Sequence, residues 1–290
     1  MSTTEAVAVG ASFPRAERRR PTLGAVIAWE VSKLLAQMRA RVTLAFCVLG
    51  PILIVAILHG QQRPPKDSLF GRLIHESGLA MPLLILGFAS QWVLPLLTAL
   101  VAGDIFASED QHGTWKTVLT RSTSRSQLFW AKTVTALTFA VTVLVVLAAS
   151  TIVSSVLLVG KQPLVGLSGQ IIPSGTALAL VTASWGTALA PVIAFTCFAI
   201  LLSVKSRNPA FGIAAPVVVG MVMQLVGALG GMEAIRPLLL TTPFESWHGL
   251  FTENRFTGPL VAGIAVSVAW SIGSLGWAYV SLRRRDITGG

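Results

Sequence analysis

Residues 133–160 read TVTALTFAVTVLVVLAASTIVSSVLLVG and contain no Asp, Glu, Lys or Arg. A helix needs about 20 predominantly apolar residues to cross roughly 30 Å of hydrocarbon, and each charge near its centre costs about 2.5–3.5 kcal/mol. Hydrocarbon also leaves backbone N–H and C=O groups without outside partners, so a single crossing segment must be helical. These residues are therefore predicted to form a membrane-spanning helix.

Five further long stretches are also free of Asp, Glu, Lys and Arg. They are residues 42–59, 78–103, 176–203, 210–232 and 260–282. The composition agrees, because 12% of all residues are charged, against about 25% in an ordinary soluble domain. Kinks are expected at the prolines inside these stretches, Pro51, Pro82, Pro95, Pro191 and Pro216. The chain is predicted to be an all-α integral membrane protein with six transmembrane helices.

The Lys and Arg residues are distributed unevenly between the two sides that six spans would define. The side that holds both termini receives 16 of the 22 Lys and Arg residues. By the positive-inside rule, both termini are predicted to be cytoplasmic. The net charge of +10 could instead suggest a nucleic-acid partner, but these cations flank the spans and form no groove with interleaved aromatic residues. No nucleic-acid partner is expected.

The segment before the first span divides into two parts. Residues 1–21 are predicted to be a mobile cytoplasmic tail, and residues 42–290 form the six-helix transmembrane domain. Between them, residues 22–41 show an amphipathic pattern of the kind that lies in the membrane interface. Its apolar face carries Leu23, Ile27, Val31, Leu34 and Met38, and its polar face carries Glu30, Lys33, Gln37 and Arg41. The alternative is that residues 22–41 are the cytoplasmic start of the first span.

Residues 233–259 connect the fifth and sixth stretches on the predicted outer side. Residues 235–240 and 244–251 are apolar but too short to cross the bilayer. They are predicted to form one or two short helices in the outer interface, with Trp247 and Phe251 at headgroup depth. A plain surface loop is the alternative.

The inner loop after the second stretch reads GDIFASEDQHGTWKTVL over residues 103–119, followed by TRSTSR over residues 120–125. Gly113 can end a helical extension by adopting a positive φ, and Thr114 can cap a short helix that follows. Ser124 and Gln127 form a capping-box pattern that predicts the start of the third span. The loop is therefore predicted to hold a short helix between two long ones.

This loop resembles that of the type-2 ABC transporter permeases, the ABC-2 family of six-span, type V exporter-like membrane subunits. The matching residues are Glu109, Gly113, Thr114, Ser124, Arg125 and Lys132. The resemblance implies that the loop docks onto a separate ATPase subunit and that Glu109 pins it near the membrane. The residues implied in coupling are Glu109, Asp110, Gly113, Thr114, Lys116, Arg121 and Arg125. The alternative is that Glu109 and Asp110 are solvated charges offset by Lys116 and Arg121.

An ATP-binding loop would need the pattern G-x-x-x-x-G-K-[ST], which this chain lacks. ATP and Mg²⁺ are therefore expected on a partner ATPase, with no cofactor, metal site or enzymatic activity in this chain. The resemblance implies two ATPase copies and a second permease copy or a similar permease, all in a bacterial plasma membrane. It implies export of an amphipathic or hydrophobic substrate. An ATP-independent channel or secondary carrier is the alternative.

Two amides lie near the middle of predicted spans, Gln91 in the second and Gln224 in the fifth. An amide in hydrocarbon is costly unless it is paired or hydrated. The resemblance places these two spans around the translocation path. The substrate path is therefore predicted to be lined by Phe88, Gln91, Trp92, Met221 and Gln224. Alternatively, each Gln bonds a neighbouring helix.

Overall fold

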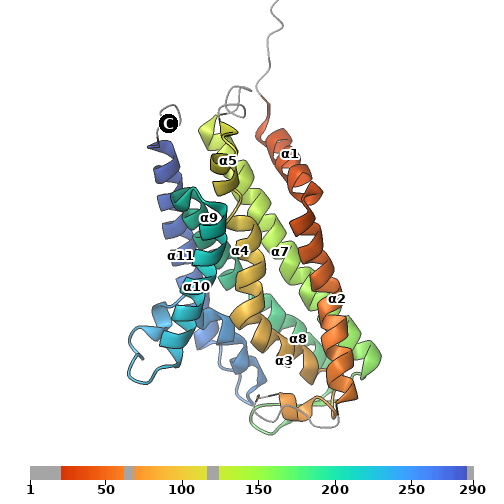
Figure 1. Cartoon of the computed structure of the whole chain (residues 1–290). Helices are drawn as coiled ribbons and strands as arrows, with labels where there is room; N and C mark the ends of the chain where they lie inside the picture. Colours follow the sequence, from red (N-terminus) through yellow and green to blue (C-terminus); the bar gives the residue numbers. More distant parts are fainter. Residues whose placement is uncertain (1–20, 62–67, 69, 116–123, 286–290) are drawn as a thin grey trace, which may run out of the picture.

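The computed structural model describes residues 21–61, 68, 70–115 and 124–285. Six helices within these residues are long and apolar enough to cross a membrane, and they run side by side as a bundle (Figure 1). Their bounds are Met38–Gly60, Ala80–Ala102, Arg125–Leu158, Ser174–Ser206, Pro209–Ala228 and Gly258–Arg283. The predicted all-α membrane architecture with six spans is confirmed.

The first span, α2 (Met38–Gly60), is preceded by α1 (Leu23–Ala36), and the break between them lies at Gln37 rather than near Arg41. The two helices follow one edge of the bundle (Figure 1). The predicted division of residues 22–41 into an apolar and a polar face does not match their burial. Glu30 is buried, whereas Met38 of the predicted apolar face is 78% exposed. The reason is that α1 packs on the third span, which offers Glu30 a cationic partner. The interfacial position of α1 stays a prediction.

The second span changes its helical type partway along. It consists of α3 (Ala80–Phe88), a π-helical turn η2 (Ala89–Val93) and α4 (Leu94–Ala102). Pro95 has no N–H, and its ring crowds the carbonyl of Gln91 four residues earlier. The N–H of Leu94 bonds the carbonyl of Ala89, five residues back. The π-helical turn is thus how this span accommodates Pro95.

The third span is α7 (Arg125–Leu158), and it begins at the predicted capping box of Ser124 and Gln127. A short hairpin of β1 (Leu164–Val165) and β2 (Ile171–Ile172) follows, with Leu164 opposite Ile172. The fourth span, α8 (Ser174–Thr187) and α9 (Leu189–Ser206), is interrupted at Ala188, three residues before Pro191. The fifth span, α10 (Pro209–Ala228), is uninterrupted at Pro216, as α2 is at Pro51. The helix is therefore interrupted near some of the prolines at which kinks were predicted, such as Pro191, and continuous through others, such as Pro51 and Pro216.

Three short 3-10 helices lie at the end of the bundle opposite the described chain ends. They are η1 (Gly71–Leu73), η3 (Arg236–Leu238) and η4 (Thr242–Phe251), and the last two precede the sixth span, α11 (Gly258–Arg283). Short helices in residues 233–259 are therefore confirmed. Trp247 and Phe251 are buried in the protein, where their ring centroids lie 5.9 and 5.5 Å from that of Phe70. They pack inward because Phe70 provides an apolar partner, instead of meeting lipid headgroups.

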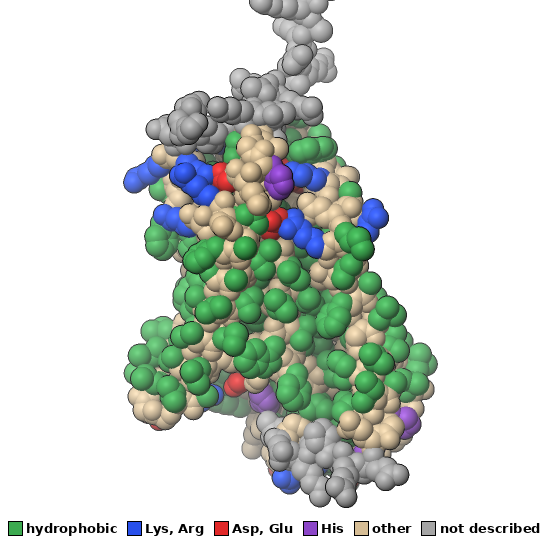
Figure 2. Space-filling model, viewed as in Figure 1, with side chains coloured by type: hydrophobic (Ala, Val, Ile, Leu, Met, Phe, Trp, Pro, Cys, Tyr) green, Lys and Arg blue, Asp and Glu red, His purple; other side chains and the backbone are tan. Residues whose placement is uncertain are grey.

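The surface of the bundle is mostly apolar along its length, and charged side chains gather at the end where α1 begins and α11 ends (Figure 2). We call this the basic end. Its described cations, placed by the ends of the helices that carry them, are Lys33, Arg39, Arg41, Arg125, Lys132, Lys205, Arg207, Arg283, Arg284 and Arg285. The second and fourth spans are mostly buried, whereas the first, fifth and sixth present most of their apolar side chains outward. The second and fourth spans are thus the centre of the bundle.

Candidate functional site

The chain leaves the second span at the basic end through a close crossing of backbones. A Cβ added to Gly103 would lie 2.2 Å from the carbonyl oxygen of Gly212, and one added to Gly212 would lie 2.1 Å from that of Gly103. Neither position can carry a side chain without movement of the backbone. The end of α4 is therefore held against the start of α10, which fixes where the next segment begins.

That segment is the short helix α5 (Ala107–Gln111), whose first turn is tied to the fourth span. The hydroxyl of Ser203 in α9 accepts hydrogen bonds from the backbone N–H groups of Phe106 and Ala107, at 3.2 and 3.1 Å. These N–H groups have no partner within a helix that starts here, so the hydroxyl satisfies them. The Phe106 ring also packs between Trp115 and Phe129. The start of α5 is thereby anchored in the bundle.

Glu109 of α5 turns inward and is 2% exposed. Its Oε1 lies 2.9 Å from Nζ of Lys132 in α7 and 2.5 Å from Nζ of Lys33 in α1. The hydroxyl of Thr114 donates to the other carboxylate oxygen. Gly113 adopts a φ of 62°, as predicted, and this left-handed turn brings Thr114 back beside Glu109. Glu109 therefore has partners on three separate segments.

Lys132 also lies 3.1 Å from Oε2 of Glu30 in α1. We call Glu30, Lys33, Glu109 and Lys132 the charge cluster. It contains two positive and two negative groups, and only Lys33 has substantial solvent exposure, 38% of its side chain against 1–3% for the other three. Buried ions are costly unless paired, and removing one partner is strongly destabilising. The balanced cluster therefore holds α1, α5 and α7 together.

The pKa of Glu109 reflects this environment. Burial alone would raise the pKa of this carboxyl, but the Lys132 charge and hydrogen bonds from Lys33, Thr114 and Lys132 outweigh burial and lower it from 4.5 to about 2. Glu109 is consequently ionised throughout the physiological pH range. A carboxylate that stays ionised can serve as an electrostatic anchor for Lys33 and Lys132.

Further ion pairs tie the same region to two other helices. Arg39 at the start of α2 pairs with Asp104, which is buried just after the second span. Arg285, beyond the end of α11, binds both carboxylate oxygens of Asp110, one of them at 2.9 Å. The guanidinium of Arg125 donates to the backbone carbonyl of Arg285 at 2.9 Å. Residues 104–115 are therefore held from the first, third, fourth and sixth spans.

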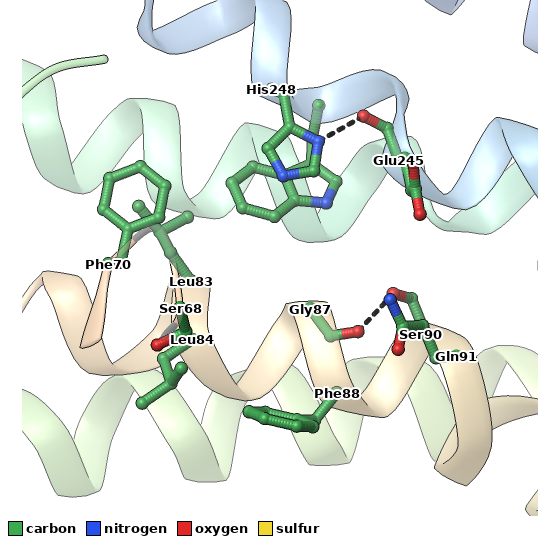
Figure 3. Close-up of a pocket in the computed structure, with 11 residues that line it drawn as sticks. Ser68, Phe70, Leu83, Leu84, Gly87, Phe88, Ser90, Gln91, Glu245 and His248 are labelled. Atoms are coloured by element: carbon green, nitrogen blue, oxygen red, sulfur yellow. Dashed lines mark hydrogen bonds between the residues drawn. The ribbon is translucent and has the colours of Figure 1, made fainter. Parts of the chain in front are cut away.

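A second candidate site lies toward the opposite end. A cavity of about 270 Å³ separates η4 from the second span, and Phe88 and Gln91 are among its lining residues. Figure 3 shows Glu245 and His248 on one side of it and Gly87, Ser90 and Gln91 on the facing side. The hydroxyl of Ser90 donates to the carbonyl of Gly87 at 3.0 Å. The cavity has apolar walls with a few polar groups, as small-molecule sites usually do.

Residues 26–227 match the family model described as ABC-2 family transporter protein, a match that covers more than half of the chain. The chain belongs to this family. No curated protein matches it. The family assignment makes this ABC-2 protein a multi-pass membrane permease subunit of an ABC transporter, which associates with an ABC ATPase and is not itself the catalytic ATPase. The matched region begins within α1 and ends within α10, so it includes the whole charge cluster.

The predicted coupling residues of the ABC-2 protein are only partly grouped in the structure. Glu109, Asp110, Gly113 and Thr114 lie together in and after α5, and Arg125 lies beside the end of α11. Lys116 and Arg121, and the short helix that Thr114 was predicted to cap, lie outside the described residues. The alternative of solvated charges does not hold for Glu109, which is buried beside Lys132, and Asp110 pairs with Arg285. The part of that alternative that concerns Lys116 and Arg121 lies outside the described residues.

The predicted path residues of the ABC-2 protein do not all meet at one cavity. Phe88 and Gln91 line the 270 Å³ cavity, but Trp92, Met221 and Gln224 are not among its lining residues. Trp92 and Met221 are each nearly half exposed, and Nε2 of Gln224 is buried without a hydrogen-bond partner among the described residues. The α10 helix packs beside η2, so Gln91 and Gln224 lie on neighbouring segments. A substrate path between these two segments stays a prediction.

The sequence reasoning did not assign site roles to Glu30, Lys33, Asp104 and Arg39. One signal was present: Glu30 follows the apolar residues 23–29 and Lys132 directly precedes a long apolar stretch. Single charges at the border of hydrocarbon usually have a partner. The signal does not say which charges pair, because the partners are 102 residues apart.

Proposed function

We propose that this permease is part of an ATP-driven exporter that moves an amphipathic or hydrophobic substrate across a bacterial plasma membrane. Two separate ATPase subunits would bind ATP and Mg²⁺ and dock at the basic end, which would face the cytoplasm. The excess of Lys and Arg at that end supports this orientation. A second copy of the chain, or a similar permease, would complete the pathway.

The observation that carries the proposal is the charge cluster. Glu109 lies on the loop between the second and third spans, and its partners Lys33 and Lys132 lie on α1 and α7. A push on this loop would therefore reach α1, and through it the first span, as well as the third span. Coupling needs such an element, because binding energy at one site acts on another only through a shared structural change. Asp110, Gly113, Thr114, Lys116, Arg121 and Arg125 are proposed to complete the docking region.

The proposed substrate class follows from the residues that line the cavity beside the second span. The cavity beside η2 combines the apolar residues Leu83 and Phe88 with the polar groups of Ser90 and Gln91. A small inorganic ion would recover only part of its lost water shell there, because the described lining residues offer one carboxylate, Glu245, and few other polar groups. A molecule with a large apolar part fits better, and Gln91 would supply polar contact.

The proposal is tested by purifying the full chain from its native membrane and measuring ATP-driven transport in inverted vesicles. An ABC ATPase subunit should copurify, and uptake of an amphipathic dye should require ATP hydrolysis. Glu109→Gln should uncouple ATP hydrolysis from uptake while the protein still inserts and elutes as a single species. His112→Gln, at an exposed neighbouring position, is the matched control and should transport normally.

Transport without ATP by a preparation that contains no ATPase would instead identify an ATP-independent channel or carrier.

A separate test concerns the predicted substrate path. Gln91→Ala and Gln224→Ala should change the relative uptake of different amphipaths while the ATPase still copurifies. Unchanged preference in both variants would reduce the two amides to packing groups.

A further inference from the structure

Two cavities meet along one edge of the second span. The first is the cavity of about 270 Å³ under η4, which we now call the head pocket. The second, of about 340 Å³, lies between α2, α7 and the second span, and we call it the chain groove. Leu84 and Phe88 line both. They are one helical turn apart, so they form a ridge on α3 with a cavity on each side.

The chain groove has no polar side chain among its lining residues. They are Phe46, Gly50, Pro51, Ile54, Leu58, Leu84, Ile85, Phe88, Ala89, Val93 and Leu147. Phe46 and Ile54 are each more than 40% exposed, so the groove opens on the outward-facing side of α2. An aqueous solute gains nothing from such a surface, whereas a hydrocarbon chain does.

The head pocket differs from the groove in both charge and hydrogen bonding. Glu245 contributes a carboxylate, and none of the described lining residues is Lys or Arg. The Arg236 guanidinium lies 3.5 Å from the Glu245 carboxylate, but the two side chains are 53% and 40% exposed, so this pair is weak. The Gln91 amide makes no hydrogen bond to any described residue. A ligand would find a free amide and a carboxylate here.

Aromatic rings complete the head pocket. Phe70, Phe88 and Trp247 line it, and the His248 ring stacks on Trp247 with 3.9 Å between centroids. Aromatic faces beside a carboxylate are the usual surroundings of a bound ammonium or guanidinium group. In Figure 3 the Phe88 ring points away from His248, whereas Gln91 lies on the side of Glu245. Leu84 and Phe88 therefore separate a groove without polar side chains from a pocket that Gln91 and Glu245 make partly polar.

We propose that the head pocket and the chain groove together bind one cationic amphipath. Its alkyl chain lies in the groove, its ammonium or guanidinium head lies between Glu245, Gln91 and the aromatic rings, and it bends over Leu84 and Phe88. Both volumes are close to the lower end of the roughly 300–1,000 Å³ usual for small-molecule sites. This inference rests on the proposed export of amphipaths and names the charge class of the cargo.

The test is photolabelling of the full-length protein in phosphatidylcholine nanodiscs. The probe is dodecylamine with a diazirine near the end of its chain, and the matched probe is dodecanoic acid with the same diazirine. Mass spectrometry should locate the label on the groove segments of α2 and α7. The amine should label them at least about fivefold more than the acid, because only the amine gains from Glu245 and the aromatic rings.

Three variants make the assignment specific. Glu245→Gln should reduce labelling by the amine about fivefold and leave labelling by the acid unchanged. Gly50→Leu and, independently, Ile54→Trp fill the groove and should abolish labelling there by either probe. Gly276→Leu is the control, because Gly276 lies in α11 and a Cβ at this position would have no atom within 4 Å. Size-exclusion elution identifies any variant that does not fold.

Equal labelling by the two probes would overturn the assignment of a cationic head. Label spread evenly over α10 and α11, or unaffected by both groove-filling variants, would overturn the site itself. Phosphatidylethanolamine, whose headgroup is an ammonium, is then added to the nanodiscs to distinguish a bilayer lipid from a dissolved amphipath. If it suppresses labelling by the amine, the occupant is a bilayer lipid. If labelling persists, the occupant is a dissolved amphipath. The labelling needs no ATP, so its outcome is independent of the transport assay. If ATP-driven transport is intact but the groove is not labelled, only this binding site is rejected. If the groove is labelled but transport does not depend on ATP, only the proposed function is rejected.

Discussion

Nζ of Lys132 in α7 lies 2.9 Å from Oε1 of Glu109 in α5, and both side chains are almost fully excluded from solvent. A charge-assisted hydrogen bond of this length is strong where water does not compete. The same ammonium reaches Glu30, so it is the one group that contacts both carboxylates of the charge cluster. Lys132 is therefore the residue whose loss should disturb the cluster most.

Lys132→Gln is expected to be strongly destabilising, by about 3–5 kcal/mol, because it leaves a surplus of buried negative charge. The measurement is thermal unfolding in mild detergent, followed by near-UV circular dichroism. Lys161→Gln removes the same charge from an exposed loop position and should change stability by less than about 0.5 kcal/mol. A Lys132→Gln protein as stable as the wild type would show that the cluster does not hold the helices together.

Glu30→Gln combined with Lys132→Gln should be less destabilising than the sum of the single changes. The double variant removes one negative and one positive group, and Glu109 keeps its contact with Lys33. The four melting curves of this double-mutant cycle give the coupling, which should be at least about 1 kcal/mol for contacting ions. Additive effects would mean that Glu30 and Lys132 act independently.

Stability should depend on pH through Glu109. Its pKa is lowered from 4.5 in the unfolded chain to about 2 in the folded protein. The unfolded chain therefore binds more protons between these values, so the stabilisation is complete above about pH 5 and is lost as the pH falls toward 2, a total of about 3 kcal/mol. Melting temperatures from pH 7 to pH 3 should fall less steeply in Glu109→Gln than in the wild type. Glu253→Gln, at an exposed site, should keep the wild-type slope.

Ser203→Ala should loosen the start of α5. It removes the acceptor of two buried N–H groups, those of Phe106 and Ala107, and a buried donor without a partner costs about 1–3 kcal/mol. Hydrogen exchange of residues 104–112 should become faster while that of α7 stays slow. Ser206→Ala is the control, since its hydroxyl is exposed and bonds only the carbonyl of Asn208. Unchanged exchange in Ser203→Ala would mean that other contacts hold α5.

Gly103→Ala and Gly212→Ala should each lower the melting temperature, because either Cβ would collide with the opposing backbone carbonyl. Backbone atoms cannot turn aside as a flexible side chain can, so the α4 and α10 helices must separate. Gly24→Ala, where nothing lies within 4 Å, should be neutral or slightly stabilising, since Ala is the better helix former. A tolerated Gly103→Ala would argue against the close crossing.

The six spans were predictable because the cost of a charge in hydrocarbon is local: it can be evaluated from residues 133–160 without knowing their neighbours. The same holds for the capping box at Ser124 and Gln127 and the positive φ at Gly113, which depend on adjacent residues only. These features are where the sequence predictions and the structure agree.

The position of Glu30 was not predictable in this way. Helical periodicity assigns it to the polar face, but the pattern does not distinguish a polar face that meets water from one that meets a buried Lys132. The inward packing of Trp247 was missed for the same reason, since its partner Phe70 is remote in sequence. Both misses concern which distant residue is the neighbour, which local propensity does not encode.

The pairing of Glu30 with Lys132 sets an order of assembly during synthesis. Glu30 emerges from the ribosome 102 residues before its partner, so α1 cannot dock until the third span has been made. Until then, the Glu30 carboxylate lacks the Lys132 partner that it has in the folded protein, a state that is tolerated best near the headgroups. The final packing of α1 must therefore wait until the chain has been made as far as the third span.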